Sequence, residues 1–279
     1  MNIKNTDYLQ ITKDTNGNQA VMVRVDKTAK DLVDACETDT LKWSRWDSKY
    51  YSPVIESITE IVKKKYEVKY LYELRKEIIV GDHIRSKLNE KYTNSEDGVL
   101  YLKSDVISNT GLQLYKVKKV TKNTYERLKR SQPHKGDLLV AFSGSIGKML
   151  LIEKNYGPAV TCDLCIFRVK YVNPFYLYVY LKSNFGKTYM DILKNGTGIE
   201  HLNSDEFQLI KIPIISEDVQ NNIEKEYKSM SAYHDKAMET KSKGDETGYT
   251  KNIEKAETML KDLIARTEAV IRGERKDIV

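Results

Sequence analysis

The chain has 279 residues, of which 40% are hydrophobic and 31% are charged, and it contains only three cysteines. This length allows a sizeable core in one or two domains, whereas three cysteines are too few for a disulfide scaffold. No apolar run reaches the length of a membrane span and no secretory signal is evident, so a cytoplasmic protein without membrane contact is expected.

The net charge of +6 is modest, but the basic residues are concentrated in one part of the chain. Between positions 61 and 135 there are 18 Lys and Arg against 9 Asp and Glu. Such a segment suits the neutralisation of nucleic-acid phosphates. A solvated basic face would give the same count, so charge alone leaves both interpretations open.

Residues 1–50 form an extension without an assignable role, with an expected turn at 16–18, a short strand over 20–25 and a polar helix. Ser52-Pro53 then begins a helix whose apolar face carries Ile55, Ile58, Ile61 and Val62. Strands are expected over 99–102 and 114–120, and a short helix over 121–130.

Residues 135–148, K-G-D-L-L-V-A-F-S-G-S-I-G-K, predict a turn, an apolar strand and a Gly-rich turn. The second turn, Ser143 to Gly147, exposes backbone N–H groups and hydroxyls, and Lys148 lies beside it. These groups suit contact with phosphates or base edges. An ordinary hairpin turn has the same composition, so this segment alone does not decide between the two.

Cys162 and Cys165 form a C-x-x-C pair, which would need two further ligands to hold zinc. The four histidines show no matching spacing, and alternation through Cys165, Phe167 and Val169 favours a strand with buried thiols. No metal and no cofactor are therefore expected.

Asn173-Pro174 predicts the start of a helix over 175–183, with Asn as its cap. Its tyrosine rings are expected to pack in the core with their hydroxyls at a wet edge. The same N-P-F-Y letters are similar to an adenine-methyltransferase motif. Only thirty-one positions separate Phe142 from Asn173, however, too few for the strand-helix crossovers of that fold.

Two other enzyme classes are disfavoured by the residues around the Gly-rich turn. Met149 follows Gly147-Lys148, and Phe142 stands where a phosphate-binding loop needs glycine, which excludes that triphosphatase motif. Asp137 and Glu153 lack the acidic-x-Lys spacing of a metal-dependent nuclease. Catalysis is expected to belong to another polypeptide.

From Val219 onward the sequence predicts helices interrupted by a loop over 241–250, which contains two glycines. Beyond that loop a coiled-coil-like seam has alternating three- and four-residue spacing, and its members are Ile253, Ala256, Leu260, Leu263, Thr267 and Val270. A helix this short needs a partner. The partner is either the preceding helix or the same helix of another subunit, and the second alternative is favoured.

Five further segments complete an ordered set with the Gly-rich turn: A-V-T-C-D at 159–163, N-P-F-Y-L-Y-V-Y-L-K-S at 173–183, N-G-T-G-I-E-H-L at 195–202, I-P-I at 212–214 and V-Q-N-N-I at 219–223. From about Lys69 to its last residue the chain resembles the target recognition domain of type I restriction-modification specificity (S) subunits. The resemblance implies an α+β fold, with a mixed-sheet recognition domain over 51–216 and a helical, coiled-coil-like spacer over 217–279.

The resemblance implies a non-catalytic subunit that binds double-stranded DNA and directs a partner methyltransferase, with a restriction subunit as a further partner. The residues expected to contact DNA are Lys103, Ser143, Ser145, Lys148, Lys182, Lys187, Asn195, Thr197 and His201. The chain has one such domain where a full S subunit has two. The resemblance therefore implies either pairing of two chains through the C-terminal helices or association with a methyltransferase that brings its own binding surface. A methyltransferase or nuclease with an unfamiliar site, and a stand-alone DNA-binding regulator, are the alternatives.

Overall fold

The structure is a computed structural model that describes residues 9–13, 19–23, 65–80, 92–195 and 201–279. The chain forms two compact units, residues 1–53 and 54–279, which we describe separately. In the first unit, β1 (Leu9–Lys13) and β2 (Gln19–Val23) form an antiparallel hairpin. β2 agrees with the predicted strand, whereas β1 was not predicted. The predicted turn at 16–18, the polar helix and the helix after Ser52 lie outside the described residues.

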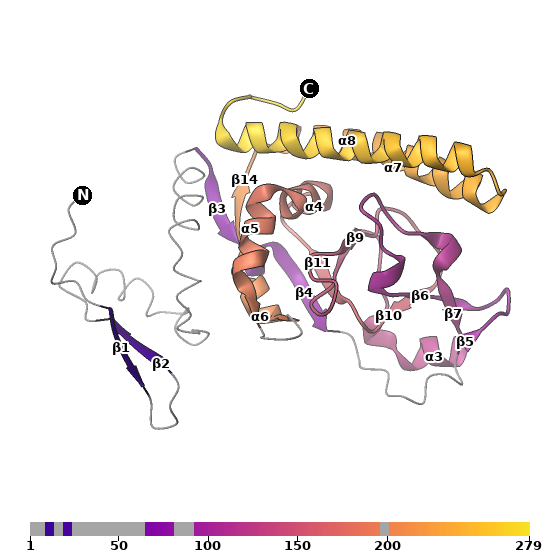
Figure 1. The fold of residues 1–279 in the computed structure, drawn as a ribbon, viewed down its shortest axis with the longest axis horizontal. Helices are drawn as coiled ribbons and strands as arrows, with labels where there is room; N and C mark the ends of the chain where they lie inside the picture. The colour runs from indigo at the N-terminus through magenta and orange to yellow at the C-terminus, as the bar shows by residue number, and fades with distance from the viewer. Residues whose placement is uncertain (1–8, 14–18, 24–64, 81–91, 196–200) are drawn as a thin grey trace. The chain divides into compact units, whose positions relative to one another are not determined.

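The second unit combines helices with antiparallel and parallel strands, which confirms the predicted α+β class (Figure 1). Its strands are β3 (Glu67–Tyr70), β4 (Arg75–Val80), β5 (Tyr92–Thr93), β6 (Val99–Leu102), β7 (Lys118–Val120), β8 (Asp137–Val140), β9 (Met149–Leu151), β10 (Ala159–Thr161), β11 (Cys165–Val169), β12 (Lys194–Asn195), β13 (His201–Leu202) and β14 (Lys211–Ile214). Its α-helices are α3 (Lys122–Arg127), α4 (Pro174–Lys182), α5 (Asn184–Leu193), α6 (Ser204–Phe207), α7 (Glu217–Ser242) and α8 (Glu246–Arg272). Short 3-10 turns include η2 (Leu71–Leu74), η4 (Ser104–Val106), η5 (Leu114–Lys116) and η6 (Lys129–Ser131).

The main sheet has the strand order β4-β11-β8-β9, and all of its neighbouring strands are antiparallel. Val80, Val140 and Cys165 align across three strands at one end, which we call the loop end. Asp137 pairs with Arg168 toward the opposite end, which we call the helix end. β8 and β9 are buried along their whole length, and apart from Asp137 they are apolar on both faces.

A second sheet has the order β10-β6-β7-β5, in which β10 and β6 are parallel. The predicted strand over 99–102 is confirmed as β6. The prediction of a strand over 114–120 is only partly right, because residues 114–116 form η5 and pairing begins at Lys118. The predicted short helix is α3, whose first turn is capped by the Thr121 hydroxyl accepting from the Thr124 N–H.

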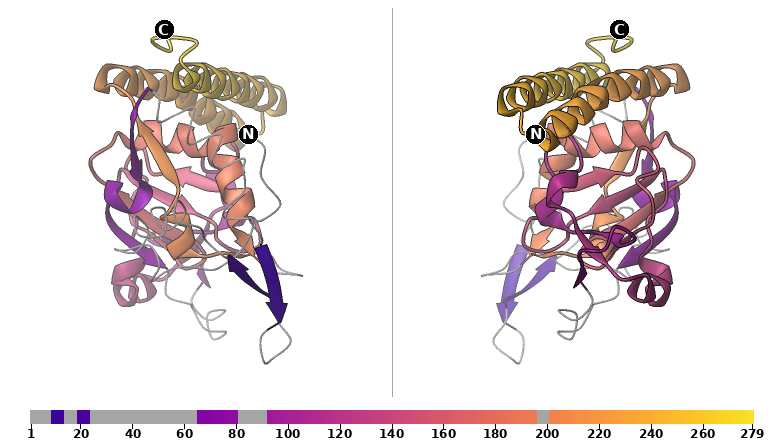
Figure 2. Two further views of the ribbon diagram at one scale, coloured as in Figure 1. Left: turned by 90° about the vertical axis from the view of Figure 1, so that its left-hand side faces the viewer. Right: turned by 90° about the vertical axis from the view of Figure 1, so that its right-hand side faces the viewer.

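Helix α4 lies between the main sheet and the two long C-terminal helices, which Figure 2 shows from two sides. All residues from Phe175 to Leu181 are buried, as expected of a helix that is apolar all round. Asn173 caps it and Pro174 occupies its first turn, which confirms the predicted helix start. The expectation of wet tyrosine hydroxyls is wrong for Tyr176 and Tyr180, which are 0% exposed. Each hydroxyl donates to a backbone carbonyl of β14 instead, so both buried hydroxyls have a hydrogen-bond partner.

Helices α7 and α8 form an antiparallel hairpin, joined by a turn over residues 243–245. The predicted loop over 241–250 is too long, because Asp245 caps α8 at the Gly248 N–H and the helix begins at Glu246. Among the described residues, no helix is long and apolar enough to cross a membrane.

The predicted seam of α8 is buried inside this chain, where α8 packs on α7 and α4. Leu260 is 4% exposed, and Leu263, Thr267 and Val270 are at most 1% exposed. The favoured prediction that this seam joins two subunits is therefore wrong. The reason is that α7 is long enough, at 26 residues, to cover the apolar stripe without another chain.

Buried polar contacts hold α7 against the β-rich part of the unit. Asn173 donates its backbone N–H to the side-chain oxygen of Gln220 and its side-chain amide to the carboxylate of Glu224, both on α7. The Ser231 hydroxyl donates to the carboxylate of Glu153, which follows β9. Burial raises the pKa of Glu153, and the Ser231 hydrogen bond opposes that shift.

His234 of α7 makes the most buried of these contacts, at 2% exposure. Its Nε2 lies 3.0 Å from the Leu112 carbonyl oxygen and therefore donates to it, so Nδ1 accepts from the Thr110 hydroxyl at 2.9 Å. Gly111 is required between them, because a Cβ there would lie 2.9 Å from Nε2. Burial lowers the pKa of His234, although the Leu112 carbonyl opposes this.

Replacing His234 with Gln is expected to make the free energy of unfolding depend less on pH in the acid range. Because the folded pKa of His234 lies below its unfolded value near 6.5, stability is fully present above that pH and is lost as the pH falls through it. Urea unfolding at pH 7.5, 6.5 and 5.5 measures the slope. Equal slopes in wild type and His234→Gln would contradict the assignment.

Candidate nucleic-acid interface

The Gly-rich turn leaves the loop end of the main sheet between β8 and β9. The Ala141 N–H donates to the Lys148 carbonyl, which closes the hairpin, and the Lys148 N–H donates to the Ser145 carbonyl within the turn. Gly144 and Gly147 have φ of +68° and +82°, which other residues rarely adopt, and so permit the reversal. Ser143 is exposed and Ser145 half-buried, so the predicted contact residues of this turn reach the surface.

A segment more than fifty positions later pairs with this turn. His201 of β13 forms an antiparallel bridge with Ser143, and the Leu202 N–H donates to the Phe142 carbonyl at 2.8 Å. The Asn195 backbone pairs with His201 in the β12–β13 hairpin. The structure therefore brings Ser143, Asn195 and His201 together, while Thr197 lies outside the described residues. We call the turn Ser143–Lys148 with β12 and β13 the loop-end surface.

Aromatic packing beneath this surface positions the two segments. The rings of Phe142 and Phe207 lie 5.2 Å apart, and Phe207 also contacts Phe167 of β11 at 6.2 Å. Phe207 is fully buried on α6, directly after β13. The contacts join turn, hairpin and sheet, so the exposed side chains above them start from a fixed backbone.

Two of the lysines predicted to contact DNA form interactions within the chain. The Lys148 ammonium donates to the Ser104 carbonyl at 3.2 Å, and Lys103 forms an ion pair with Asp163 at 3.4 Å. Both lysines are only partly exposed. An ammonium has three donors, so the single bond of Lys148 leaves others for a further acceptor.

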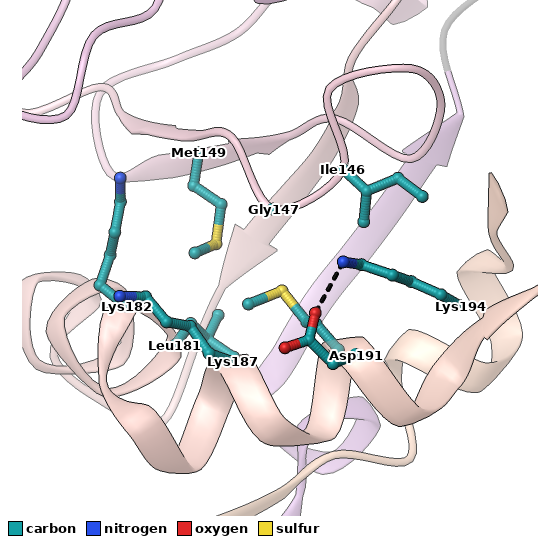
Figure 3. A pocket seen from close by; sticks show the side chains of 9 residues that line it. Ile146, Gly147, Met149, Leu181, Lys182, Lys187, Asp191 and Lys194 are labelled. Atoms are coloured by element: carbon teal, nitrogen blue, oxygen red, sulfur yellow. Dashed lines mark ion pairs between the residues drawn. The ribbon is translucent and has the colours of Figure 1, made fainter. Parts of the chain in front are cut away.

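Lys182 and Lys187 lie next to the turn, at the cavity shown in Figure 3. The cavity also receives Lys194, which we did not predict as a site residue. A signal existed, because Lys187 and Asp191 are four residues apart on one face of α5, and Lys194 follows three residues later, directly after that helix. Asp191 and Lys194 form an ion pair at 2.6 Å.

The electrostatic state of Lys182 differs from that of an ordinary surface lysine. Its pKa is lowered to about 8, first by burial and then by the positive charges of Lys187 and Lys148. Its ammonium lies 5.5 Å from the centre of the Tyr178 ring. The pKa shift links Lys182, Lys187 and Lys148 electrostatically, although they come from α4, α5 and the Gly-rich turn.

Exposed cations on β7, α3 and the residues directly after α3 include Lys118, Lys122, Arg127, Lys129 and Arg130. Figures 1 and 2 place α3 on the side of the unit away from α7 and α8. Lys122 and Arg127 of α3 therefore contribute surface charge on the side to which the tip of β4 points. Lys135 lies near Glu224 of α7 instead, and η5, which carries Lys116, packs on α7.

The two carboxylates considered for catalysis lie at the helix end instead. Asp137 is 5% exposed, accepts from the His134 N–H at 2.8 Å and pairs with Arg168 at 3.4 Å. Glu153 accepts from Ser231, as described above. Across the described ranges, no three His, Cys, Asp or Glu side chains gather as metal ligands would. Cys162 and Cys165 are buried free thiols, and β11 includes Cys165, as the predicted strand requires.

Comparison with solved structures found several similar chains, among them the two that follow. One is the S subunit of a type I restriction-modification system from M. genitalium, at 16% identity and a TM-score of 0.42, covering 64% of this chain and 41% of that chain. The other is the type IIG restriction endonuclease BpuSI, at 11% identity and a TM-score of 0.47, covering 96% of this chain and 37% of that chain. This chain thus spans less than half the length of either. Comparison with curated proteins found no match.

Residues 63–243 match the family described as the type I restriction modification DNA specificity domain. The match covers more than half of the chain and includes the Gly-rich turn, the β12–β13 hairpin and all of α7. It confirms the resemblance drawn from the ordered sequence segments. The chain belongs to the family of type I restriction-modification DNA specificity domains.

Proposed function

We propose that this chain is the non-catalytic specificity component of a restriction-modification system, which binds duplex DNA and directs a partner methyltransferase. The observation that carries the proposal is the pairing of the Gly-rich turn with β13, beside Lys182 and Lys187. Two exposed polar segments meet there on a rigid base next to concentrated positive charge. That combination suits a surface that reads bases and holds phosphates.

The proposed division of labour follows from the chemistry of the side chains. Lys103, Lys148, Lys182 and Lys187 would hold phosphate oxygens, which fixes the register of the protein on the duplex. The polar groups of Ser143, Ser145, Asn195, Thr197 and His201 would meet base edges in the major groove, where each base pair presents a distinct pattern of donors and acceptors.

The proposed partners are a methyltransferase and, in a system that also cleaves, a restriction subunit. The helical hairpin is the proposed assembly element, and its outer faces are the ones available because the α8 seam is buried within the chain. Pairing of two chains through these faces would give a symmetrical DNA target, since half-site symmetry mirrors protein symmetry. We place the complex in the cytoplasm.

Affinity for mixed-sequence duplex DNA is expected to fall steeply as salt rises, and Lys148→Ala should lower it for every sequence alike. Losing one phosphate contact should make the slope of log affinity against log salt concentration less negative by about one. Fluorescence anisotropy at several salt concentrations measures both effects. Lys251→Ala, at an exposed position on α8, is the matched control and should leave the slope unchanged. Salt-independent binding by the wild type would contradict a duplex-binding role.

The non-catalytic part of the proposal is tested with labelled S-adenosylmethionine. The pure chain should transfer no methyl group to duplex DNA, and tagged chain recovered from its source cells should bring down a methyltransferase that does. Methyl transfer by the pure chain would favour the enzyme alternative. Sequence-specific binding without any associated enzyme would favour the stand-alone regulator.

A further inference from the structure

The cavity beside the Gly-rich turn is small and is lined by two kinds of groups. Its volume is about 230 Å³, below the roughly 300–1,000 Å³ typical of sites for organic ligands. Leu181, Met149 and Met190 supply apolar walls. Three lysines supply the charge, with Lys182 and Lys187 on one side and Lys194 on the other (Figure 3). The volume suits one charged group rather than a whole organic molecule.

Positive charge in the cavity exceeds negative charge. Asp191 is the single carboxylate among the lining residues, and it pairs with Lys194. No carboxylate of the described residues forms an ion pair with Lys182 or Lys187. Lys148, from the turn, adds a further positive charge near Lys182. Like charges held together in a partly buried site repel one another, and a bound anion would relieve that repulsion.

We propose that this cavity holds one phosphate group, bound by Lys182 and Lys187 beside the Gly-rich turn. Lysine binds phosphate as a point charge, and two ammonium groups from α4 and α5 supply six N–H donors to its oxygens. The inference rests on the proposed function for its preferred source, the backbone of duplex DNA. A free phosphate ion has the same chemistry and is the alternative source.

Phosphate binding in this cavity has a consequence for pH. Because the pKa of Lys182 is about 8 in the free protein, the lysine is partly neutral there. The groups that face it are Lys148 from the turn, Lys187 and Asp191 from α5, and Lys194 from β12. A phosphate favours the charged form of Lys182, so binding raises that pKa and takes up protons. Affinity should accordingly fall as the pH rises through 8.

Isothermal titration calorimetry of the full chain measures this proton uptake. A mixed-sequence duplex is titrated at pH 8 in two phosphate-free buffers that differ in ionisation enthalpy. The wild type should take up about half a proton for each bound chain. Lys182→Arg should still bind but take up almost none, because guanidinium stays charged. Lys251→Arg on α8 is the matched control and should keep the wild-type uptake.

A second variant covers the case in which Lys182→Arg fails to fold. Lys187 is exposed, so Lys187→Gln should fold, and it should both reduce the uptake at pH 8 and flatten the salt dependence by about one unit. Duplex binding whose salt slope and proton uptake are the same in wild type and both variants overturns the phosphate site and leaves the proposed function standing.

A titration with inorganic phosphate alone identifies the source of the phosphate. Uptake that depends on Lys182 with DNA but not with millimolar phosphate supports the DNA backbone. Uptake with inorganic phosphate by a chain that binds no duplex keeps the phosphate site and assigns it to free phosphate, while it overturns the proposed function. Binding of both probes that neither Lys182→Arg nor Lys187→Gln alters overturns the site.

Discussion

Replacing Leu260 and Leu263 together with Asp is expected to cost roughly 5 kcal/mol or more of the free energy of unfolding. Burial of each leucine contributes on the order of 1.5–3 kcal/mol, and a buried carboxylate adds a further penalty. Both side chains are almost fully buried, at 4% and 1% exposure. A loss of this size is comparable with the whole stability of an ordinary domain, about 5–15 kcal/mol.

Urea unfolding followed by circular dichroism measures this loss, and light scattering measures the mass of the wild type. The matched control is Lys261→Asp, an exposed position between the two leucines, which should change stability little. The result that contradicts the structure is a double mutant of unchanged stability that falls to half the wild-type mass. That outcome would place the seam between two chains.

Replacing Arg168 with Met is expected to destabilise the protein by about 3 kcal/mol at pH 7, because it leaves the buried Asp137 carboxylate without its cation. Arg168 also pairs with Glu77 at 2.7 Å and donates to the Gln132 carbonyl at 3.2 Å. Burial already raises the pKa of Asp137, against the pull of the His134 N–H and Arg168.

The sign of the pH effect follows from that shift. A raised folded pKa favours the folded state at pH values below the unfolded pKa, and this contribution is lost as the pH rises through the folded value. Without Arg168 the folded pKa should rise further, so the variant should be less impaired at pH 5 than at pH 7. Urea unfolding at both pH values checks this.

Asp137→Asn in the Arg168→Met background supplies the control. An amide oxygen still accepts from the His134 N–H but carries no charge, so the double variant should recover stability at pH 7. Equal stability of Arg168→Met and its Asp137→Asn derivative at pH 7 would show that the loss comes from packing of the arginine stem.

Local signals in the sequence predicted several elements correctly because their causes are local. Asn173-Pro174 fixes a helix start through a cap and a restrained φ, and the structure has that start. Gly144 and Gly147 permit a reversal between two apolar strands, and the structure has a hairpin there. The family resemblance followed from the order of such segments, and the family match confirms it.

Long-range contacts were beyond the reach of the same signals. The apolar seam on α8 predicts that another element packs against it, but only the fold shows that this element is α7 together with α4. No sequence pattern near Ser143 or His201 predicts that these two residues pair, because their pairing depends on the fold of the whole intervening chain. Lys194 was missed because helical spacing does not reveal which cavity a helix face adjoins. The proposed contact residues themselves remain predictions.

The contacts of the Gly-rich turn and the contacts of α7 lie at opposite ends of the main sheet, so the sequence of the turn could change without changing the contacts of α7. The Gly-rich turn and β13 meet at the loop end, whereas Asn173 and Glu153 join α7 at the helix end. Under the proposed function, exchange of turn sequences between relatives would diversify the DNA targets while the helical hairpin kept its shape. New specificities could then arise by recombination without a matching change in the partner enzyme.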